Sequence, residues 1–218
     1  MSGPTVLVMA KAPVPGRAKT RLAAVTGDEV AADLAAAALL DTIEAVGAVP
    51  GARGHLALAG DLSTACRGTE LVIAVEGWRV TAQRGATFAE RLAAAHLDAG
   101  HGLVVQVGMD TPQLTPDLLA RTLDDLAGHD ACLGPAPDGG WWALARHDPA
   151  VAAPLAGVTM STTATYDDTR AALLGAGHRV SSTTPLADVD TIEDAAEVAR
   201  LAPGTRFAAA FRAWEGLS

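Results

Sequence analysis

The stretch Val6-Leu-Val-Met-Ala-Lys-Ala-Pro-Val-Pro-Gly16 joins a short apolar run to a Pro/Gly loop, and an alanine-rich stretch over residues 29–46 follows it. A short, continuously apolar run is typical of a buried strand. The alanine-rich stretch contains neither proline nor glycine and is long enough to form a helix. The chain therefore begins as strand, loop and helix, which is the repeating unit of an α/β fold.

Strand-like and helix-like segments alternate along the rest of the chain. The pattern predicts strands at residues 55–58, 71–75, 103–107, 131–133, 141–144 and 179–181. It predicts helices at residues 88–97, 115–126, 165–174, 192–201 and 206–214. This alternation favours a mostly parallel central sheet with helices on both faces, a three-layer α/β/α sandwich. Because we see no internal repeat and no linker, we expect a single domain over residues 1–218.

The composition limits the partners that the chain can bind. Of all residues, 50% are hydrophobic and 19% are charged, so the chain can bury a sizeable core. The formal net charge of −9 disfavours binding to nucleic acid or to an anionic membrane. A phosphate-bearing ligand must therefore be held by a local group of cations.

The sequence also favours a cytoplasmic protein. No apolar run is long enough to cross a membrane, and no basic segment precedes the N-terminal apolar run as it would in a signal peptide. Cys66 and Cys132 lack the spacing of a metal or redox motif. We therefore expect both cysteines to be reduced, buried and structural.

A cluster of cations occupies the loop after the first strand. It consists of Lys11, Arg17, Lys19 and Arg21, and Lys11 and Lys19 are the two lysines of the chain. Ammonium groups suit phosphate oxygens, and backbone amides ahead of the next helix can add donors. The glycine spacing is neither that of a Walker A loop nor that of a dinucleotide fingerprint. A solvated basic turn is the alternative, but the position at the end of a strand favours a phosphate site.

The segment Leu103-Val-Val-Gln-Val-Gly-Met-Asp110 reads as a buried strand that ends in a carboxylate, with a helix start close behind at Thr115. Ligands of such sheets bind beyond the carboxyl ends of the strands. Mg²⁺ prefers oxygen ligands and is commonly shared between carboxylates and substrate phosphates. Asp110 is therefore a candidate metal ligand, and a turn or capping aspartate is the alternative.

A second group of carboxylates follows the predicted strand at residues 179–181. Asp188 and Asp190 lie two positions apart, so they would point to the same side of an extended segment. Asp190 could instead cap the next helix, with Glu193 as its reciprocal partner. We expect Asp188 to be the second metal ligand and Asp190 to be a further candidate.

The segment Gly134-Pro-Ala-Pro-Asp138-Gly-Gly-Trp-Trp142 lies between the two carboxylate groups. Gly139 and Gly140 permit close approach of the backbone to a ligand, and Trp141 or Trp142 offers a flat surface for a sugar or base. Alternation along a strand sends one of the two tryptophan rings into the core. Asp138 could bind an acceptor hydroxyl or act as a base, and a tight Asp-Gly turn is the alternative.

Two further segments could contact a substrate. Gln83 and Gly85, together with Arg91, could face a nucleotide, and Ser161 and Thr162 could supply hydroxyls. An ordinary charged helix and an N-cap are the respective alternatives. The six histidines show neither metal-ligand spacing nor a nucleophile partner, which excludes hydrolase triads from the hypotheses.

Residues 9–22, 108–114, 134–141 and 188–194 together resemble the DUF2064 family, and the resemblance spans almost the whole chain. It implies the GT-A (Rossmann-like) fold of the nucleotide-diphospho-sugar transferase superfamily. Lys19-Thr-Arg-Leu and Asp188-Val-Asp are also similar to guanylyltransferases that act on phospholactate or phosphoenolpyruvate. The chain departs from the expected pattern at Arg84, where we expect glycine, and at Trp142, where we expect a tyrosine-like residue.

The resemblance also implies roles for the candidate residues. Lys11, Arg17, Lys19 and Arg21 would contact phosphates. Mg²⁺, with Mn²⁺ as an alternative, would be held by Asp110 and by Asp188 or Asp190.

Three functions follow as hypotheses. The first is nucleotidyl transfer, in which a small phosphorylated or carboxylated acceptor attacks a nucleoside triphosphate and pyrophosphate leaves; Lys19, Arg17 and Asp138 would then be catalytic. The second is glycosyl transfer from a nucleoside-diphosphate sugar, and the third is nucleotide binding without catalysis. Phe207, Phe211 and Trp214 form a helical stripe that permits a homodimer, although such a stripe is more often core.

Overall fold

The fold is described from a computed structural model of residues 3–216, so the two residues at each end of the predicted 1–218 domain lie outside the described residues. Its centre is one seven-stranded sheet with the strand order β3-β2-β1-β4-β6-β5-β7. The strands are β1 (Thr5–Lys11), β2 (Arg53–Ala59), β3 (Arg79–Ala82), β4 (Val104–Val107), β5 (Ala131–Pro135), β6 (Trp141–Arg146) and β7 (Val180–Ser182). Only β6 runs antiparallel to its neighbours, β4 and β5, in this described sheet. The prediction of a mostly parallel sheet is confirmed.

Side chains alternate across β1 and therefore define the two faces of the sheet. Val6 and Val8 belong to a buried cluster with side chains of α2 (Asp28–Gly47), α3 (Gly68–Ala74) and α5 (Pro116–Asp125). Leu7 and Met9 belong to a second cluster with side chains of α4 (Phe88–Ala99), α6 (Thr165–Gly175) and the 3-10 segment η2 (Pro149–Gly157). Helices thus cover both faces, as predicted for a three-layer α/β/α sandwich.

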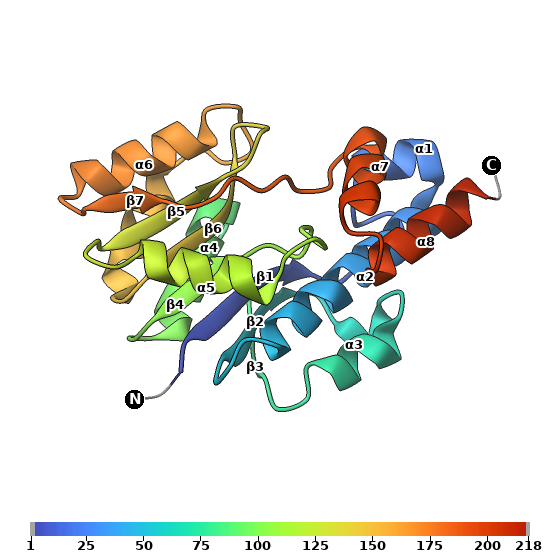
Figure 1. Cartoon of the computed structure of the whole chain (residues 1–218), viewed down its shortest axis with the longest axis horizontal. Coiled ribbons are helices and arrows are strands. Elements are labelled where there is room, and N and C mark those ends of the chain that lie inside the picture. Colours follow the sequence, from blue (N-terminus) through green and yellow to red (C-terminus); the bar gives the residue numbers. More distant parts are fainter. Residues whose placement is uncertain (1–2, 217–218) are drawn as a thin grey trace.

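A third buried cluster lies beyond the sheet and is built mainly by helices, with Val189 from the segment that precedes α7 (Ile192–Leu201). Helices α1 (Thr20–Thr26), α7 and α8 (Arg206–Glu215) gather around one end of α2 (Figure 1). Phe207 and Phe211 stack with ring centroids 6.4 Å apart, and both are almost fully buried. These two rings of the predicted stripe are therefore core, and a homodimer stays a prediction. Within residues 3–216, no helix combines the length and the apolar character needed to span a membrane.

The structure corrects the sequence prediction between residues 62 and 82. Residues 71–75 were expected to form a strand because they are apolar and partly β-branched, but α3 occupies this region. The chain turns into α3 at Arg67, which has a left-handed backbone (φ 53°), and the helix buries Leu71 while leaving Ile73 58% exposed. The true strand, β3, is a mostly exposed edge strand without an apolar run, which explains why its pattern was missed. A short 3-10 segment, η1 (Leu62–Thr64), and α1 were also not foreseen.

The two cysteines are free, as expected. Cys132 is fully buried, whereas Cys66 is only half-buried, so the expectation of two buried thiols is wrong for Cys66. Burial raises the pKa of both thiols. A structural role fits Cys132 best.

The packing of the third cluster gives a direct stability test. Phe207→Ala should lower the free energy of unfolding by about 3–5 kcal/mol, because the ring is buried and a cavity would remain. Phe88→Ala is the matched control, since Phe88 is 46% exposed, and it should cost less than about 1 kcal/mol. Urea denaturation of the two variants measures the difference, and equal losses would contradict the assignment of Phe207 to the core.

Candidate metal and phosphate site

The segment between β7 and α7 crosses the molecule and brings the two predicted carboxylate groups together (Figure 1). The backbone N–H of Val189 donates to the carbonyl of Asp110 over 2.9 Å, and the side-chain amide of Gln113 donates to the carbonyl of Ala187. Val189 is buried in the third cluster. Because its neighbours alternate along an extended segment, Asp188 and Asp190 face away from that core and toward Asp110.

Asp110, Asp188 and Asp190 form a carboxylate triad. Each offers an oxygen atom, and these oxygens all lie within 4.8 Å of one another. Burial, followed by the negative charges of Asp110, Asp138 and Asp190, raises the pKa of Asp188 to about 6. Three half-buried carboxylates with converging oxygens are a donor set that fits a hard divalent cation such as Mg²⁺ or Mn²⁺.

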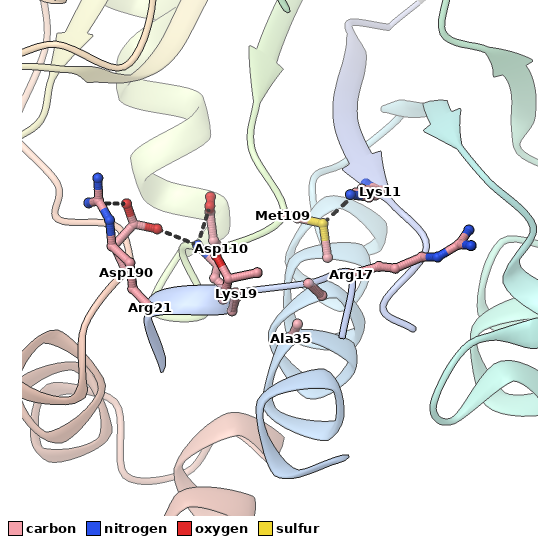
Figure 2. Close-up of a pocket in the computed structure, with 10 residues that line it drawn as sticks. Lys11, Arg17, Lys19, Arg21, Ala35, Met109, Asp110 and Asp190 are labelled. Atoms are coloured by element: carbon pink, nitrogen blue, oxygen red, sulfur yellow. Dashed lines mark hydrogen bonds and ion pairs between the residues drawn. The ribbon is translucent and has the colours of Figure 1, made fainter. Parts of the chain in front are cut away.

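Lys19 lies between two members of the triad. Its ammonium Nζ is 2.7 Å from Oδ2 of Asp110 and 2.8 Å from Oδ1 of Asp190, and the side chain is only 14% exposed (Figure 2). Burial disfavours its charged form, but the attraction and hydrogen bonds of the two carboxylates outweigh burial and raise the pKa of Lys19. Lys19 in turn lowers the pKa of Asp190 against the effect of burial. The ammonium of Lys19 and the carboxylate of Asp190 therefore stabilise each other in their charged forms.

The helix cap next to Asp190 is displaced from the position considered in the sequence. The N-cap of α7 is Thr191, and Asp194 at the third helical position completes the reciprocal capping box. The alternative in which Asp190 caps the helix with Glu193 is therefore wrong, because the cap and its partner each lie one residue further along the chain. Asp190 is left free to contact Lys19, and its Oδ2 also lies 3.6 Å from the guanidinium of Arg21.

The cationic loop and two members of the triad, Asp110 and Asp190, line one cavity of about 340 Å³. Its lining consists of Lys11, Arg17, Ala18, Lys19, Thr20, Arg21, Ala35, Met109, Asp110 and Asp190. The backbone of Lys11 is held by Met109, whose sulfur accepts its N–H over 3.3 Å. Lys19 and Arg21 turn toward the carboxylates, whereas Arg17 extends away from them (Figure 2). The cavity thus brings cations and carboxylates together at the carboxyl ends of the strands, and their roles as phosphate and metal ligands stay predictions.

Asp138 lies close enough to Asp188 to raise the pKa of Asp188, but one of the two carboxylate oxygens of Asp138 already accepts a hydrogen bond. Oδ1 accepts from the backbone N–H of Gly140 over 2.8 Å, which is the tight Asp-Gly turn named as the alternative. Gly139 has φ 89°, and a Cβ there would lie 2.0 Å from the carbonyl oxygen of Thr163. The chain's own packing therefore explains this glycine, and the substrate roles of Asp138, Gly139 and Gly140 stay predictions.

The remaining sequence candidates contact neighbours in the protein. The side-chain amide of Gln83 donates to the carbonyls of Ala10 and Ala57, each over 2.9 Å, and so ties β1 to β2. Trp142 is the core tryptophan, with 3% exposure, and the indole N–H of Trp141 donates to Thr169.

Three candidates lie in turns. Ser161 has a left-handed backbone (φ 62°) and Gly85 has φ 136°. The hydroxyl of Thr162 bonds within its own turn to Thr165. None of the three belongs to the lining of the described cavity. Their ligand contacts stay predictions.

Sequence reasoning missed the residues that position the site. Gln113 and Val189 make the cross-links described above, and Ala35 lines the cavity from α2. Gln113 could have been noticed as a polar side chain next to the Asp110 motif. No local signal marks Ala35, because only the packing of α2 brings it to the loop.

The two aspartates of the crossing segment should respond to mutation with opposite signs. In EDTA at pH 8, Asp188→Asn should raise the free energy of unfolding by about 1 kcal/mol, because a carboxyl with a raised folded-state pKa loses stability once pH exceeds its unfolded value. Asp190→Asn should lower the free energy of unfolding, since it removes the partner of Lys19. The Asp188 effect should fade below about pH 4, where its unfolded-state carboxyl is protonated, whereas the Asp190 effect should persist at pH 4 because its folded-state pKa is lowered. Urea denaturation at pH 8 and pH 4 measures them, and effects of the same sign would contradict this geometry.

Comparison with known proteins places the chain in a family. The profile of DUF2064, described as an uncharacterised protein conserved in bacteria, matches residues 42–162. A provisionally named nucleotide-diphospho-sugar transferase from Desulfovibrio desulfuricans G20 is 28% identical, with a TM-score of 0.83, and the match covers 100% of this chain and 97% of that chain. A search of curated proteins finds no match.

More distant solved structures share the fold. Rv0371c of Mycobacterium tuberculosis H37Rv, solved in complex with manganese, is 21% identical with a TM-score of 0.55, covering 89% of this chain and 97% of that chain. CMP:2-keto-3-deoxy-manno-octonic acid synthetase, solved with CTP, is 14% identical with a TM-score of 0.55, covering 93% and 99%. These matches confirm the predicted fold class. The prediction of a transferase agrees with the name of the first structure, which is 28% identical. Because the profile covers more than half of the 218 residues, the chain belongs to the DUF2064 family and has the fold of the nucleotide-diphospho-sugar transferase superfamily.

Proposed function

We propose that the protein is a metal-dependent nucleotidyltransferase that transfers a nucleotide from a nucleoside triphosphate to a small phosphorylated or carboxylated acceptor, with release of pyrophosphate. The observation that carries the proposal is the cavity of about 340 Å³, whose lining combines four cations with Asp110 and Asp190, two members of a carboxylate triad. A cation cluster alone fits any anion, and a carboxylate triad alone fits any hard cation. Their combination fits a triphosphate with its metal.

Each part of the cavity has a role in this reaction. Asp110, Asp188 and Asp190 would hold the divalent ion, which supplies positive charge to the phosphate oxygens. Lys11, Arg17, Lys19 and Arg21 would bind the triphosphate and stabilise the charge that develops on pyrophosphate as it leaves. No side chain needs to form a covalent bond to the nucleotide. Catalysis would therefore rest on positioning and electrostatics.

The relatives agree with this proposal without deciding the substrate. One is named for a bound nucleoside triphosphate, CTP, and another for bound manganese. Both are less than 25% identical to the chain, so they support the fold and not the residue roles. The base, the acceptor, the choice of Mg²⁺ or Mn²⁺ and a cytoplasmic location stay predictions.

Glycosyl transfer from a nucleoside-diphosphate sugar is the second candidate, favoured by the name of the structure that is 28% identical. Asp138 would then act as the base toward an acceptor hydroxyl. Its turn hydrogen bond to Gly140 occupies one of its two carboxylate oxygens and leaves the other available. Nucleotide binding without catalysis, the third hypothesis, does not require three converging carboxylates.

A thermal-shift screen distinguishes these functions. Nucleoside triphosphates, diphosphate sugars and monophosphates would each be added with and without Mg²⁺ or Mn²⁺, because a ligand of the folded state raises its melting temperature. Metal-dependent stabilisation by a triphosphate, followed by pyrophosphate release with phosphorylated or carboxylated acceptors, is the expected result. Preferential stabilisation by a diphosphate sugar would replace nucleotidyl transfer by glycosyl transfer, and no stabilisation by any nucleotide would contradict both.

Removal of one carboxylate tests the metal role. Asp110→Asn should lower pyrophosphate release by at least about 100-fold, since it removes one ligand of the triad. Asp124→Asn is the matched control, because Asp124 is an exposed aspartate on α5 outside the cavity lining, and it should leave the rate unchanged. Equal rates in the two variants would contradict a metal role for Asp110.

A further inference from the structure

The ammonium of Lys19 occupies the oxygens that a metal would use. Its Nζ lies 2.7 Å from Asp110 and 2.8 Å from Asp190, and both residues belong to the carboxylate triad. The side chain is 14% exposed, so the contact is enclosed and not a loose surface pair. A divalent ion bound by all three aspartates would bring its positive charge next to this ammonium, and like charges at that range repel each other.

Lys19 therefore cannot contact the carboxylates of the triad and the phosphate oxygens of a bound nucleotide at the same time. In the structure it neutralises part of the charge of the triad. Under the proposed function it would bind phosphate oxygens in the adjoining cavity, whose lining it shares. The loop that carries it includes a left-handed residue, since Lys19 itself has φ 47° and no side-chain cap stabilises the start of α1. Non-glycine residues adopt this conformation at some cost, and the two ion pairs offset that cost here.

We propose that Lys19 is a built-in substitute cation, which a divalent metal must displace from Asp110 and Asp190 and which then binds the triphosphate that enters with the metal. This inference rests on the proposed function, because it requires a metal at the triad. The inference also predicts the order of affinities. A metal alone binds weakly because it competes with Lys19 for the carboxylates. A triphosphate strengthens metal binding because its phosphates bind the displaced ammonium. Linkage requires the metal to strengthen triphosphate binding by the same factor.

The two lysines provide an internal comparison within one chain. Lys11 lines the same cavity but is exposed to solvent. Among residues 3–216, no carboxylate lies within ion-pair distance of its ammonium. An amine-specific acylating reagent with mass-spectrometric readout should label Lys19 at least about 10-fold more slowly than Lys11, because Lys19 is enclosed and ion-paired. Saturating Mn²⁺ should raise the labelling rate of Lys19 several-fold and leave Lys11 unchanged. Further addition of a non-hydrolysable triphosphate should protect Lys19 again.

Metal affinity of variants gives a second, independent readout. Lys19→Met removes the competing cation and should bind Mn²⁺ alone about 10-fold more tightly than the unmodified protein, measured by electron paramagnetic resonance of free Mn²⁺. Arg17→Met is the charge-matched control from the same loop, and it should change this affinity by less than about 3-fold, because Arg17 extends away from the carboxylates. If Lys19→Met does not fold, Lys19→Gly serves instead, since glycine accepts the left-handed backbone.

The outcomes separate this inference from the proposed function. Mn²⁺ binding that is equal in the Lys19 variant and the unmodified protein, or labelling of Lys19 that bound Mn²⁺ leaves unchanged, would overturn the substitute-cation role and leave the metal site in place. Absence of Mn²⁺ binding in every variant would overturn the proposed metal-dependent function and this inference with it. Tighter binding in Lys19→Met, together with metal-induced labelling in the unmodified protein, supports the inference.

Discussion

The ion pairs of Lys19 with Asp110 and Asp190 hold together three parts of the chain that are far apart in sequence. They join the loop after β1, the end of β4 and the segment that leads into α7. Each carboxylate is enclosed to some degree, and unpaired charges in such positions are costly. The surrounding backbone therefore has to hold all three segments in fixed positions relative to one another. The cavity forms where these segments meet.

The layers of the fold explain why these segments meet. In a mostly parallel sheet, strands end at the same edge, so the loops after β1, β4 and β7 open toward one side. The helical cluster of α1, α7 and α8 then anchors two of them, because Leu22 of α1 and Val189 of the crossing segment are buried in the same cluster. Rigidity at the site thus comes from apolar packing outside the sheet. The proposed exchange of one cation for another then requires movement of the Lys19 side chain and not of the segments that carry the carboxylates.

Much of this architecture could be predicted from the sequence, since strand and helix periodicity is a local signal. The α/β class, the strand-end position of Asp110 and the pairing of Asp188 with Asp190 all followed from such patterns. The prediction of a strand at residues 71–75 failed because this stretch is apolar and partly β-branched. It belongs to a short helix that packs through one buried side chain, Leu71, and such a helix has no clear helical period. The contacts of Lys19, the hydrogen bond of Gln113 to Ala187 and the lining by Ala35 depend on which segments the tertiary fold brings together. The local sequence could at most have marked Gln113 as a polar neighbour of the Asp110 motif. Roles assigned to Asp138 and the adjoining glycines rested on a turn motif that also forms without a ligand.

In the proposed exchange, a metal and the ammonium of Lys19 compete for the same carboxylate oxygens. Anomalous diffraction at the manganese edge, from crystals grown with Mn²⁺ and a non-hydrolysable nucleoside triphosphate, tests that claim most directly. The account predicts one manganese peak among Asp110, Asp188 and Asp190, with the amine of Lys19 moved off the carboxylates and onto a phosphate oxygen. A manganese peak elsewhere, with Lys19 still between Asp110 and Asp190, would contradict it.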